Sequence, residues 1–261
     1  MTQRPETWYK HINYLGCGSF GEVWQGEVWI RRIEKEELVN DRLALKFSYA
    51  TVESYGVQQV IAAHDLIRDL QHPFLLGIHA YGNHGNKLWI DMELAECDLW
   101  VRCCDKMSQK LCCPPVKLAA HLRQAAEGLD FLHENGVVHC GVNPWDILVA
   151  DNAAKVADFD LARTATDRSN ANVSSYRIAA CMAPECDSGE ITRFSDQFAL
   201  ASTYAWLRLG RPLPRIEGHA QALARLPATE RQALVKALAV DPQKRYRTCS
   251  EFAKILEWSV Q

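Results

Sequence analysis

The stretch His139–Leu148, which reads HCGVNPWDIL, is the segment around which this 261-residue chain is organised. An apolar run over Leu118–His133 has the character of a helix, and Asn135-Gly136 then gives a helix-stop signal. Twelve residues beyond Asp146 comes Asp158-Phe159-Asp160. A loop that holds His, Pro and Asp, followed by an apolar triplet and then an Asp-Phe turn, is the pattern that decides the fold prediction.

A glycine-rich turn near the start of the chain gives a second signal. Residues 12–30 predict a strand, a turn with Gly16, Gly18 and Gly21, and another strand. Glycines at this spacing let backbone N–H groups approach phosphate oxygens without obstruction by a Cβ atom. The same spacing also occurs in dinucleotide-binding turns, but there a helix follows, and here the following residues favour a strand.

A single lysine interrupts the next apolar strand, which reads LALKF over residues 43–47. Burial of a lysine without an anionic partner is costly, so Lys46 is expected to meet an anion such as a phosphate. A solvent-facing lysine on the edge of the strand is the alternative.

These motifs resemble the protein kinase superfamily, and in particular the bacterial Ser/Thr kinases. The family patterns are G-x-G-x-F-G-x-V, V-A-I-K, H-R-D-x-K-P-x-N-I-L and D-F-G. Farther on, Arg177–Glu185 resembles the family's G-T-P-x-Y-M-A-P-E, and the resemblance covers roughly residues 10–257. It implies that Glu185 pairs with Arg245 and that Asp196 braces the loop at His139.

The resemblance implies an α+β, two-lobed fold within one kinase-like domain over residues 1–257. A small N-lobe, about 10–95, should hold five antiparallel strands and one helix, and a larger C-lobe, about 96–257, should be mainly helical. We expect the helix over Val57–Leu70 and short strands over Leu75–His79 and Leu88–Met92. The charged segment Ile30–Asn40 is expected to be an exposed connection between strands.

The sequence keeps the order and spacing of the kinase motifs but replaces several of their functional residues. Gly141 stands at the position of the catalytic Asp, Asn143 at that of the Lys, and Asp146 at that of the metal-binding Asn. Ala63 stands where the helix Glu of the family is expected, and Cys140 replaces the Arg. Gly141 has no side chain that could accept the proton of a substrate hydroxyl, so we interpret the chain as a pseudokinase.

The nucleotide and metal ligands that the resemblance implies are mostly present. Lys46 and Asp158 occupy the remaining catalytic positions, and Asp146 and Asp158 would bind Mg²⁺ or Mn²⁺. Asp160 adds a third carboxylate where the family has Gly, with a solvated loop residue as the alternative for Asp146 and Asp160. The residues implied to contact ATP are Gly16, Gly18, Gly21, Val23, Ala44, Lys46, Met92, Glu93, Ala95 and Leu148.

Composition excludes several other classes of protein. A net charge of −3 gives no reason to expect nucleic-acid binding. The polar start Met1–Lys10 is unlike a signal peptide, and no apolar run reaches the roughly 18 residues of a membrane span. The cytoplasm is therefore the expected location, and the ten cysteines, including the doublets Cys103-Cys104 and Cys112-Cys113, are expected to be reduced thiols.

Three functions compete on this evidence. The first is a pseudokinase that binds ATP with a divalent metal and acts as a regulatory scaffold for another protein, such as a client kinase or a signalling partner. The second is a weakly active Ser/Thr protein kinase or another ATP-dependent transferase. The third is an interaction module that binds no nucleotide because side chains such as Trp145 close its pocket.

Overall fold

The computed structural model describes residues 6–32, 35–104, 113–167, 176–214 and 218–261. The chain divides into two compact units. The first comprises residues 1–59 and 76–95, and the second comprises residues 60–75 and 96–261.

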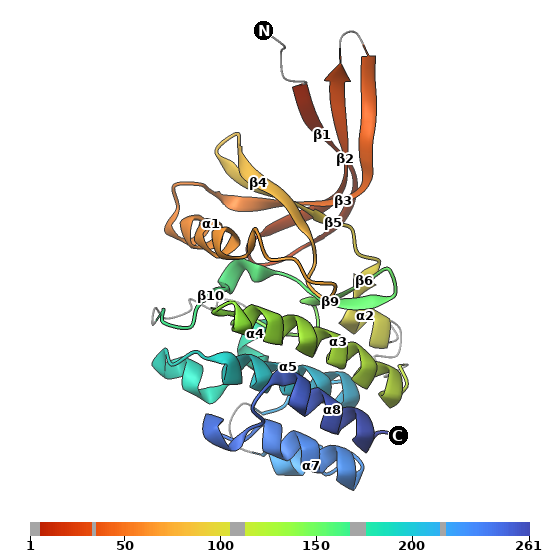
Figure 1. The fold of residues 1–261 in the computed structure, drawn as a ribbon, viewed down its shortest axis with the longest axis vertical. Coiled ribbons are helices and arrows are strands. Elements are labelled where there is room, and N and C mark those ends of the chain that lie inside the picture. The colour runs from red at the N-terminus through yellow and green to blue at the C-terminus, as the bar shows by residue number, and fades with distance from the viewer. Residues whose placement is uncertain (1–5, 33–34, 105–112, 168–175, 215–217) are drawn as a thin grey trace. The chain divides into compact units, whose positions relative to one another are not determined.

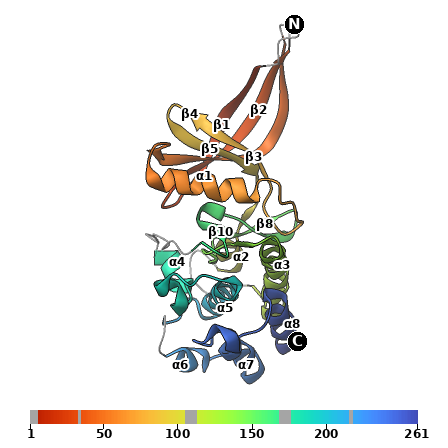
Figure 2. The same cartoon turned by 60° about the vertical axis from the view of Figure 1, so that its left-hand side comes forward.

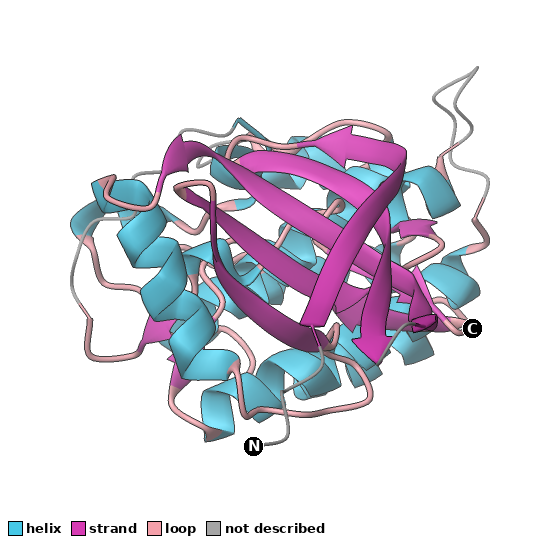
Figure 3. Cartoon of the chain, turned by 90° about the horizontal axis from the view of Figure 1, so that it is seen from above, coloured by secondary structure: helices cyan, strands magenta, loops and turns pink. Residues whose placement is uncertain are grey.

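A five-stranded antiparallel sheet forms the first unit, in the order β1-β2-β3-β5-β4. Figure 3 shows the twist of its strands, which follows from the handedness of L-amino acids. Leu43, Leu45, Leu88 and Ile90 are buried in this unit. The five strands are β1 (Glu6–Cys17), β2 (Gly21–Arg32), β3 (Lys35–Thr51), β4 (Ile78–His84) and β5 (Lys87–Glu93).

The prediction of an exposed connection over Ile30–Asn40 is wrong. Strand β2 continues to Arg32 and β3 already begins at Lys35, so the two strands form one long hairpin (Figure 1). Backbone pairing extends outward to Arg32 and Lys35. The charged residues suggested a connection, but backbone hydrogen bonds with a neighbouring strand do not depend on side-chain polarity.

The hairpin of β4 and β5 also differs from the prediction. Strand β4 begins at Ile78 rather than Leu75 and continues to His84 rather than His79. The turn itself contains only Gly85 and Asn86, both with positive φ, a conformation that Gly and Asn adopt more easily than other residues.

Helix α1 (Tyr55–Ile67) matches the predicted helix, and the boundary between the two units falls inside it. Its buried positions include Val57, Val60, Ala63 and Ile67, whose spacing of three or four residues gives one helical face.

The second unit is mainly helical. Its α-helices are α2 (Leu99–Cys103), α3 (Pro115–Glu134), α4 (Tyr176–Cys181), α5 (Arg193–Leu209), α6 (His219–Leu223), α7 (Ala228–Ala237) and α8 (Cys249–Ser259). Its short strands are β6 (Cys97–Asp98), β7 (Val137–Val138), β8 (Ile147–Ala150), β9 (Ala153–Val156) and β10 (Arg163–Thr164). Its 3₁₀ turns are η1 (Phe159–Leu161), η2 (Pro184–Ser188) and η3 (Pro242–Lys244).

Helix α5 is the centre of this unit, because every residue from Ser195 to Leu207 is buried. A capping box between Thr192 and Ser195 starts the helix, and Gly210 in the left-handed conformation ends it. Helix α3 ends before Asn135-Gly136, as the sequence predicts, and it packs along α8 (Figure 2).

A buried ion pair joins the segment after α4 to the segment before α8. Both terminal nitrogens of Arg245 donate to the Glu185 carboxylate, at 2.7 and 2.8 Å. The Arg245 side chain is fully buried, and its other donors reach backbone carbonyls such as that of Phe194. The predicted pair of Glu185 and Arg245 is confirmed.

Two findings concern the composition-based predictions. The described cysteines form no disulfide with one another, and Cys112 of the second doublet lies outside the described residues. Among the helices that the structure describes, none is long and apolar enough to cross a membrane.

Candidate functional site

One face of the first-unit sheet carries four of the residues expected to contact a nucleotide. Val23 of β2 stands opposite Lys46 of β3, and Met92 of β5 stands opposite Ala44. Residues directly opposite in an antiparallel pair share a face, and so do residues two apart on one strand. The register therefore places Val23, Ala44, Lys46 and Met92 together.

The three glycines of the first turn have different surroundings. A Cβ atom at Gly21 would lie 1.9 Å from the carbonyl oxygen of Phe47, so packing against β3 requires glycine there. A Cβ atom at Gly16 or Gly18 would meet nothing within 4 Å. The packing within this unit thus does not explain these two glycines, whereas close approach of a ligand to their backbone would.

Lys46 lies near the tip of this turn, with its Nζ atom 5.3 Å from the centre of the Phe20 ring. At the end of β5, the Glu93 carboxylate accepts a hydrogen bond from the backbone N–H of Gly77 at 3.2 Å. The Glu93 side chain therefore contacts the segment that precedes β4. Ala95 is the last residue of the first unit.

In the second unit, the loop at His139 is held by buried hydrogen bonds. His139 Nε2 lies 2.9 Å from the carbonyl oxygen of Ala157, and the N–H of Gly141 donates to His139 Nδ1 at 3.3 Å. A carbonyl oxygen can only accept, so Nε2 donates to Ala157 while Nδ1 accepts from Gly141. The edge of the Phe159 ring packs on His139, with centroids 5.5 Å apart.

Asp196 braces the same loop from α5, as the resemblance implied. Its carboxylate accepts the backbone N–H groups of His139 at 2.8 Å and of Cys140 at 2.9 Å. Burial alone would raise the pKa of Asp196, but a hydrogen bond and charge attraction from His133 lower it. The fixed carboxylate holds Cys140 in the left-handed conformation, with φ of 67°.

Gly141 lies on a small pocket beside this braced loop, together with Val142, Ile178 and Met182. A Cβ atom at Gly141 would meet its nearest neighbour, Leu161 Cδ1, at 3.5 Å, which is an ordinary contact. The structure thus has room for the start of a side chain where the sequence supplies none.

Asn143 holds the loop by internal hydrogen bonds. Its side-chain amide donates to the carbonyl of Gly141 at 3.0 Å and to the Asp146 carboxylate, and its side-chain oxygen accepts from the N–H of Trp145 at 3.0 Å. A neutral amide in the place of the usual lysine therefore acts here on the loop itself.

The β8–β9 hairpin connects the two carboxylates expected to bind metal. Asp146 directly precedes β8, Asp158 follows β9, and the N–H of Ala157 donates to the backbone carbonyl of Asp146 at 2.8 Å. The Asp146 side chain is buried, whereas Asp158 is exposed and has φ of 60°. Leu148 is half-buried on β8, opposite Lys155.

The family model described as protein tyrosine and serine/threonine kinase matches residues 9–233. The chain belongs to this kinase family. It is 27% identical over 270 residues to serine/threonine-protein kinase PknF of Mycobacterium tuberculosis (strain H37Ra), covering 94% of this chain and 55% of PknF. It is 28% identical over 267 residues to PknD of M. tuberculosis (strain CDC 1551), covering 94% of this chain and 38% of PknD. The chain thus spans about half or less of the length of these kinases.

Solved kinase structures confirm the fold. The crystal structure of the M. tuberculosis PknI kinase domain matches with a TM-score of 0.71 and 24% identity, over 96% of each chain. The two-lobed α+β kinase fold is therefore confirmed, including the five-stranded antiparallel sheet of the smaller lobe. Kinases of this family use ATP and divalent metal in general.

The kinase turn at Asp158 contains a contact that sequence reasoning missed. Asp160 was expected to be a third carboxylate for metal or a solvated loop residue, but its Oδ1 atom lies 3.4 Å from Nε2 of His64 on α1. The only signal in the sequence was a histidine among apolar residues on a helical face. The two residues are 96 positions apart, so the pairing itself could not be seen.

Aromatic rings surround Trp145 in this kinase-family chain. Its ring stacks on Trp100 at 5.1 Å and meets Trp206 edge-on at 5.2 Å. The guanidinium of Arg177 lies 4.3 Å above the same ring. Trp145 therefore packs in a cluster formed by α2, α4 and α5.

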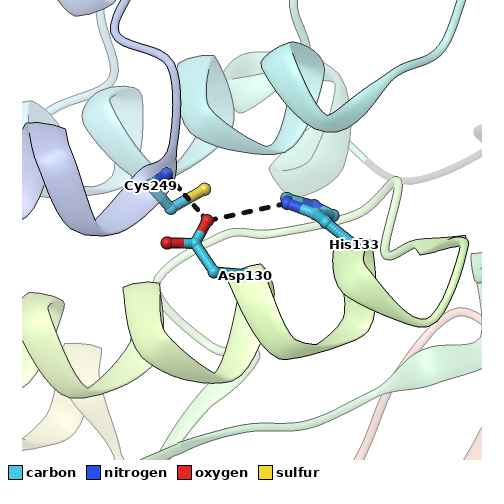
Figure 4. Close-up of side chains that lie close together, drawn as sticks. All are labelled: Asp130, His133 and Cys249. Atoms are coloured by element: carbon cyan, nitrogen blue, oxygen red, sulfur yellow. Dashed lines mark hydrogen bonds and ion pairs between the residues drawn. The ribbon is translucent and has the colours of Figure 1, made fainter.

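Figure 4 shows the one group among the described residues with the spacing of metal ligands: Asp130, His133 and Cys249, within 4.8 Å of one another. The Asp130 oxygens accept the N–H groups of Cys249 and Ser250, both at 2.9 Å, at the first turn of α8. Burial would lower the pKa of His133, but hydrogen bonds and attraction from Asp130 and Asp196 outweigh it and raise the pKa to about 9. Burial raises the pKa of Cys249 well above its usual value.

Metal ligation needs a deprotonated thiol and a neutral imidazole, and a helix N-terminus favours an anion. The raised pKa values of His133 and Cys249 do not meet the first condition, because they favour the charged imidazole and the neutral thiol. The Asp130 carboxylate at the start of α8 meets the second condition without metal. We interpret the group as a structural network that joins α3, α5 and α8.

Proposed function

We propose that this chain is a pseudokinase that binds ATP with a divalent metal ion and acts as a regulatory scaffold for another protein. The observation that carries the proposal is Gly141. The loop around it is complete, because His139, Asn143 and Asp196 fix its backbone by hydrogen bonds. A carboxylate that could accept the substrate proton is nevertheless missing from the position where the family has it.

The missing base has a large kinetic cost. General base catalysis contributes about 10²–10⁴ in rate, and kinases turn over at roughly 1–100 s⁻¹. Asn143 also cannot supply the positive charge of the usual lysine, and Ala63 cannot form an ion pair with Lys46. Phosphoryl transfer is therefore reduced to a small fraction of a normal kinase rate.

The groups that hold nucleotide remain. The open backbone at Gly16 and Gly18 and the charge of Lys46 would take the phosphates, while Val23 and Ala44 would contact the adenine. The backbone of the segment at Glu93 and Ala95 would hydrogen-bond the base. Leu148, which belongs to the second unit, is a further apolar residue that the resemblance assigns to the adenine.

The carboxylates of Asp146 and Asp158 fit a hard cation such as Mg²⁺ or Mn²⁺, because both offer anionic oxygens. When bound, the metal would neutralise the phosphate charge. Asp158 is already exposed, and Asn143 restrains the Asp146 carboxylate by a hydrogen bond.

Thermal unfolding with and without ATP, each with and without Mg²⁺ or Mn²⁺, tests the proposal. Ligand at about 100 times its Kd adds roughly 2.7 kcal/mol, or about 5–10 °C in Tm for a domain of this size. We expect a shift that requires metal and is lost in Lys46→Met. No shift at millimolar ATP would contradict nucleotide binding and favour the pure interaction module.

A weakly active transferase is the second candidate, and the carboxylates of Asp146 and Asp158 favour it. It predicts ATP-dependent transfer that persists in the wild type and disappears in Asp158→Asn. A wild type and an Asp158→Asn variant that both remain at the assay background would exclude it.

A further inference from the structure

The contact between His64 and Asp160 connects helix α1 to the turn that carries Asp158. Only 4% of the His64 side chain and 12% of the Asp160 side chain are exposed, and Nε2 and Oδ1 lie 3.4 Å apart. A partly buried carboxylate needs a compensating polar partner, and His64 supplies one.

The turn is anchored on both sides of Asp158. Before it, the N–H of Ala157 is bound to the carbonyl of Asp146. After it, the Phe159 ring is buried against His139, and Asp160 reaches His64. Asp158 itself is exposed in the left-handed conformation, which residues other than Gly and Asn or Asp rarely adopt and which surrounding structure must maintain.

We propose that His64 and Asp160 form a latch that fixes the second half of α1 to this turn and thereby positions the Asp158 carboxylate for metal. The part that concerns metal rests on the proposed function. A glycine at position 160 could not make this contact, and Ala63, one residue before His64, cannot make the ion pair that the helix Glu makes in the family. The latch thus gives α1 an anchor of its own in this chain.

Two other roles for Asp160 make different predictions. If Asp160 were a metal ligand, its removal would weaken metal binding, while removal of His64 would leave metal binding intact. If the contact only filled space, neither change would affect the metal requirement. A latch requires both single changes to act alike, and the double change to act no more strongly than either one.

Hydrogen–deuterium exchange of the protein without nucleotide or metal tests the anchoring. Asp160→Gly and His64→Leu should each speed exchange of amides 60–67 by about tenfold or more, because a hydrogen bond to a charged group is lost. Asp65→Asn is the matched control on the same helix, since 54% of the Asp65 side chain is exposed. Exchange in α3 and α5 checks that each variant is folded.

Unchanged exchange of amides 60–67 in Asp160→Gly would overturn the latch, whatever happens to His64→Leu. Asp160→Gly is the safer variant, because residue 160 lies in a turn and not inside a packed helix.

The metal concentration that gives half of the ATP-dependent Tm shift tests the positioning. We expect it to rise about threefold to tenfold in Asp160→Gly, in His64→Leu and in the double variant alike. A rise confined to Asp160 variants would overturn the latch in favour of a ligand role, and no rise would overturn the positioning. If the wild type shows no ATP shift while the variants exchange faster, the proposed function fails and the anchoring is upheld.

Discussion

Gly18 and Gly21 belong to the same turn, yet their surroundings separate a packing requirement from a binding requirement. A side chain at Gly21 would collide with the backbone of Phe47, whereas a side chain at Gly18 would enter open space. Sequence reasoning assigned both glycines to nucleotide binding and had no means of separating the two causes.

Alanine substitution should reveal this difference. Gly21→Ala should lower the free energy of unfolding by about 1–3 kcal/mol or more, because the clash is with backbone. Gly18→Ala should change it by less than about 1 kcal/mol but weaken ATP binding. Urea denaturation and ATP titration of both variants measure the two effects. Equal destabilisation by the two substitutions would contradict the assignment.

Several site residues were predictable because motif order fixes their place on strands. Ala44, Lys46, Val23 and Met92 share a sheet face as a direct result of strand register. The partner of Asp160 was not predictable, because it depends on how α1 packs on a turn 96 residues away. Local pattern carries no information about such a contact.

At the scale of elements, the network of Asp130, His133 and Asp196 joins three helices of the second unit. Burial alone would raise the pKa values of both carboxyls, but hydrogen bonds and attraction from His133 lower them. The pKa of His133 is raised to about 9 from its ordinary value of 6.5. The charged state of all three groups therefore stabilises the fold.

The network predicts a pH dependence of stability. A histidine whose pKa is raised by folding stabilises fully below pH 6.5, and this contribution is lost as the pH rises through about 9. The shift corresponds to at most roughly 3 kcal/mol. Urea denaturation between pH 6 and 10 should show a decline that is smaller in His133→Gln. Parallel curves for the two proteins would contradict the network.

The helices were easier to predict than the strands. The stop signal at Asn135-Gly136 marks the end of α3 locally. The hairpin over Ile30–Asn40 was missed because its charged residues resemble a loop, although its backbone pairs with a neighbouring strand.

At the scale of the whole molecule, the residues that maintain the kinase fold are present, whereas residues expected to carry out the kinase reaction are replaced. The Glu185–Arg245 pair and the Asp196 hydrogen bonds keep the fold, and both were predictable from motif order. The largest chemical departure is the missing side chain at Gly141, and a Cβ atom there would make only ordinary contacts. A restored carboxylate should therefore be accommodated.

Phosphoryl transfer from radiolabelled ATP to a generic protein substrate, compared between the wild type and Gly141→Asp, tests the central claim most directly. Gly141→Asn is the matched control, because it adds similar volume without a base. We predict background transfer for the wild type and Gly141→Asn, and at least a tenfold increase for Gly141→Asp, within the roughly 10²–10⁴ that a general base supplies. Wild-type turnover in the normal range of about 1–100 s⁻¹ would contradict the pseudokinase assignment. So would a folded, ATP-binding Gly141→Asp variant that transfers no faster than Gly141→Asn.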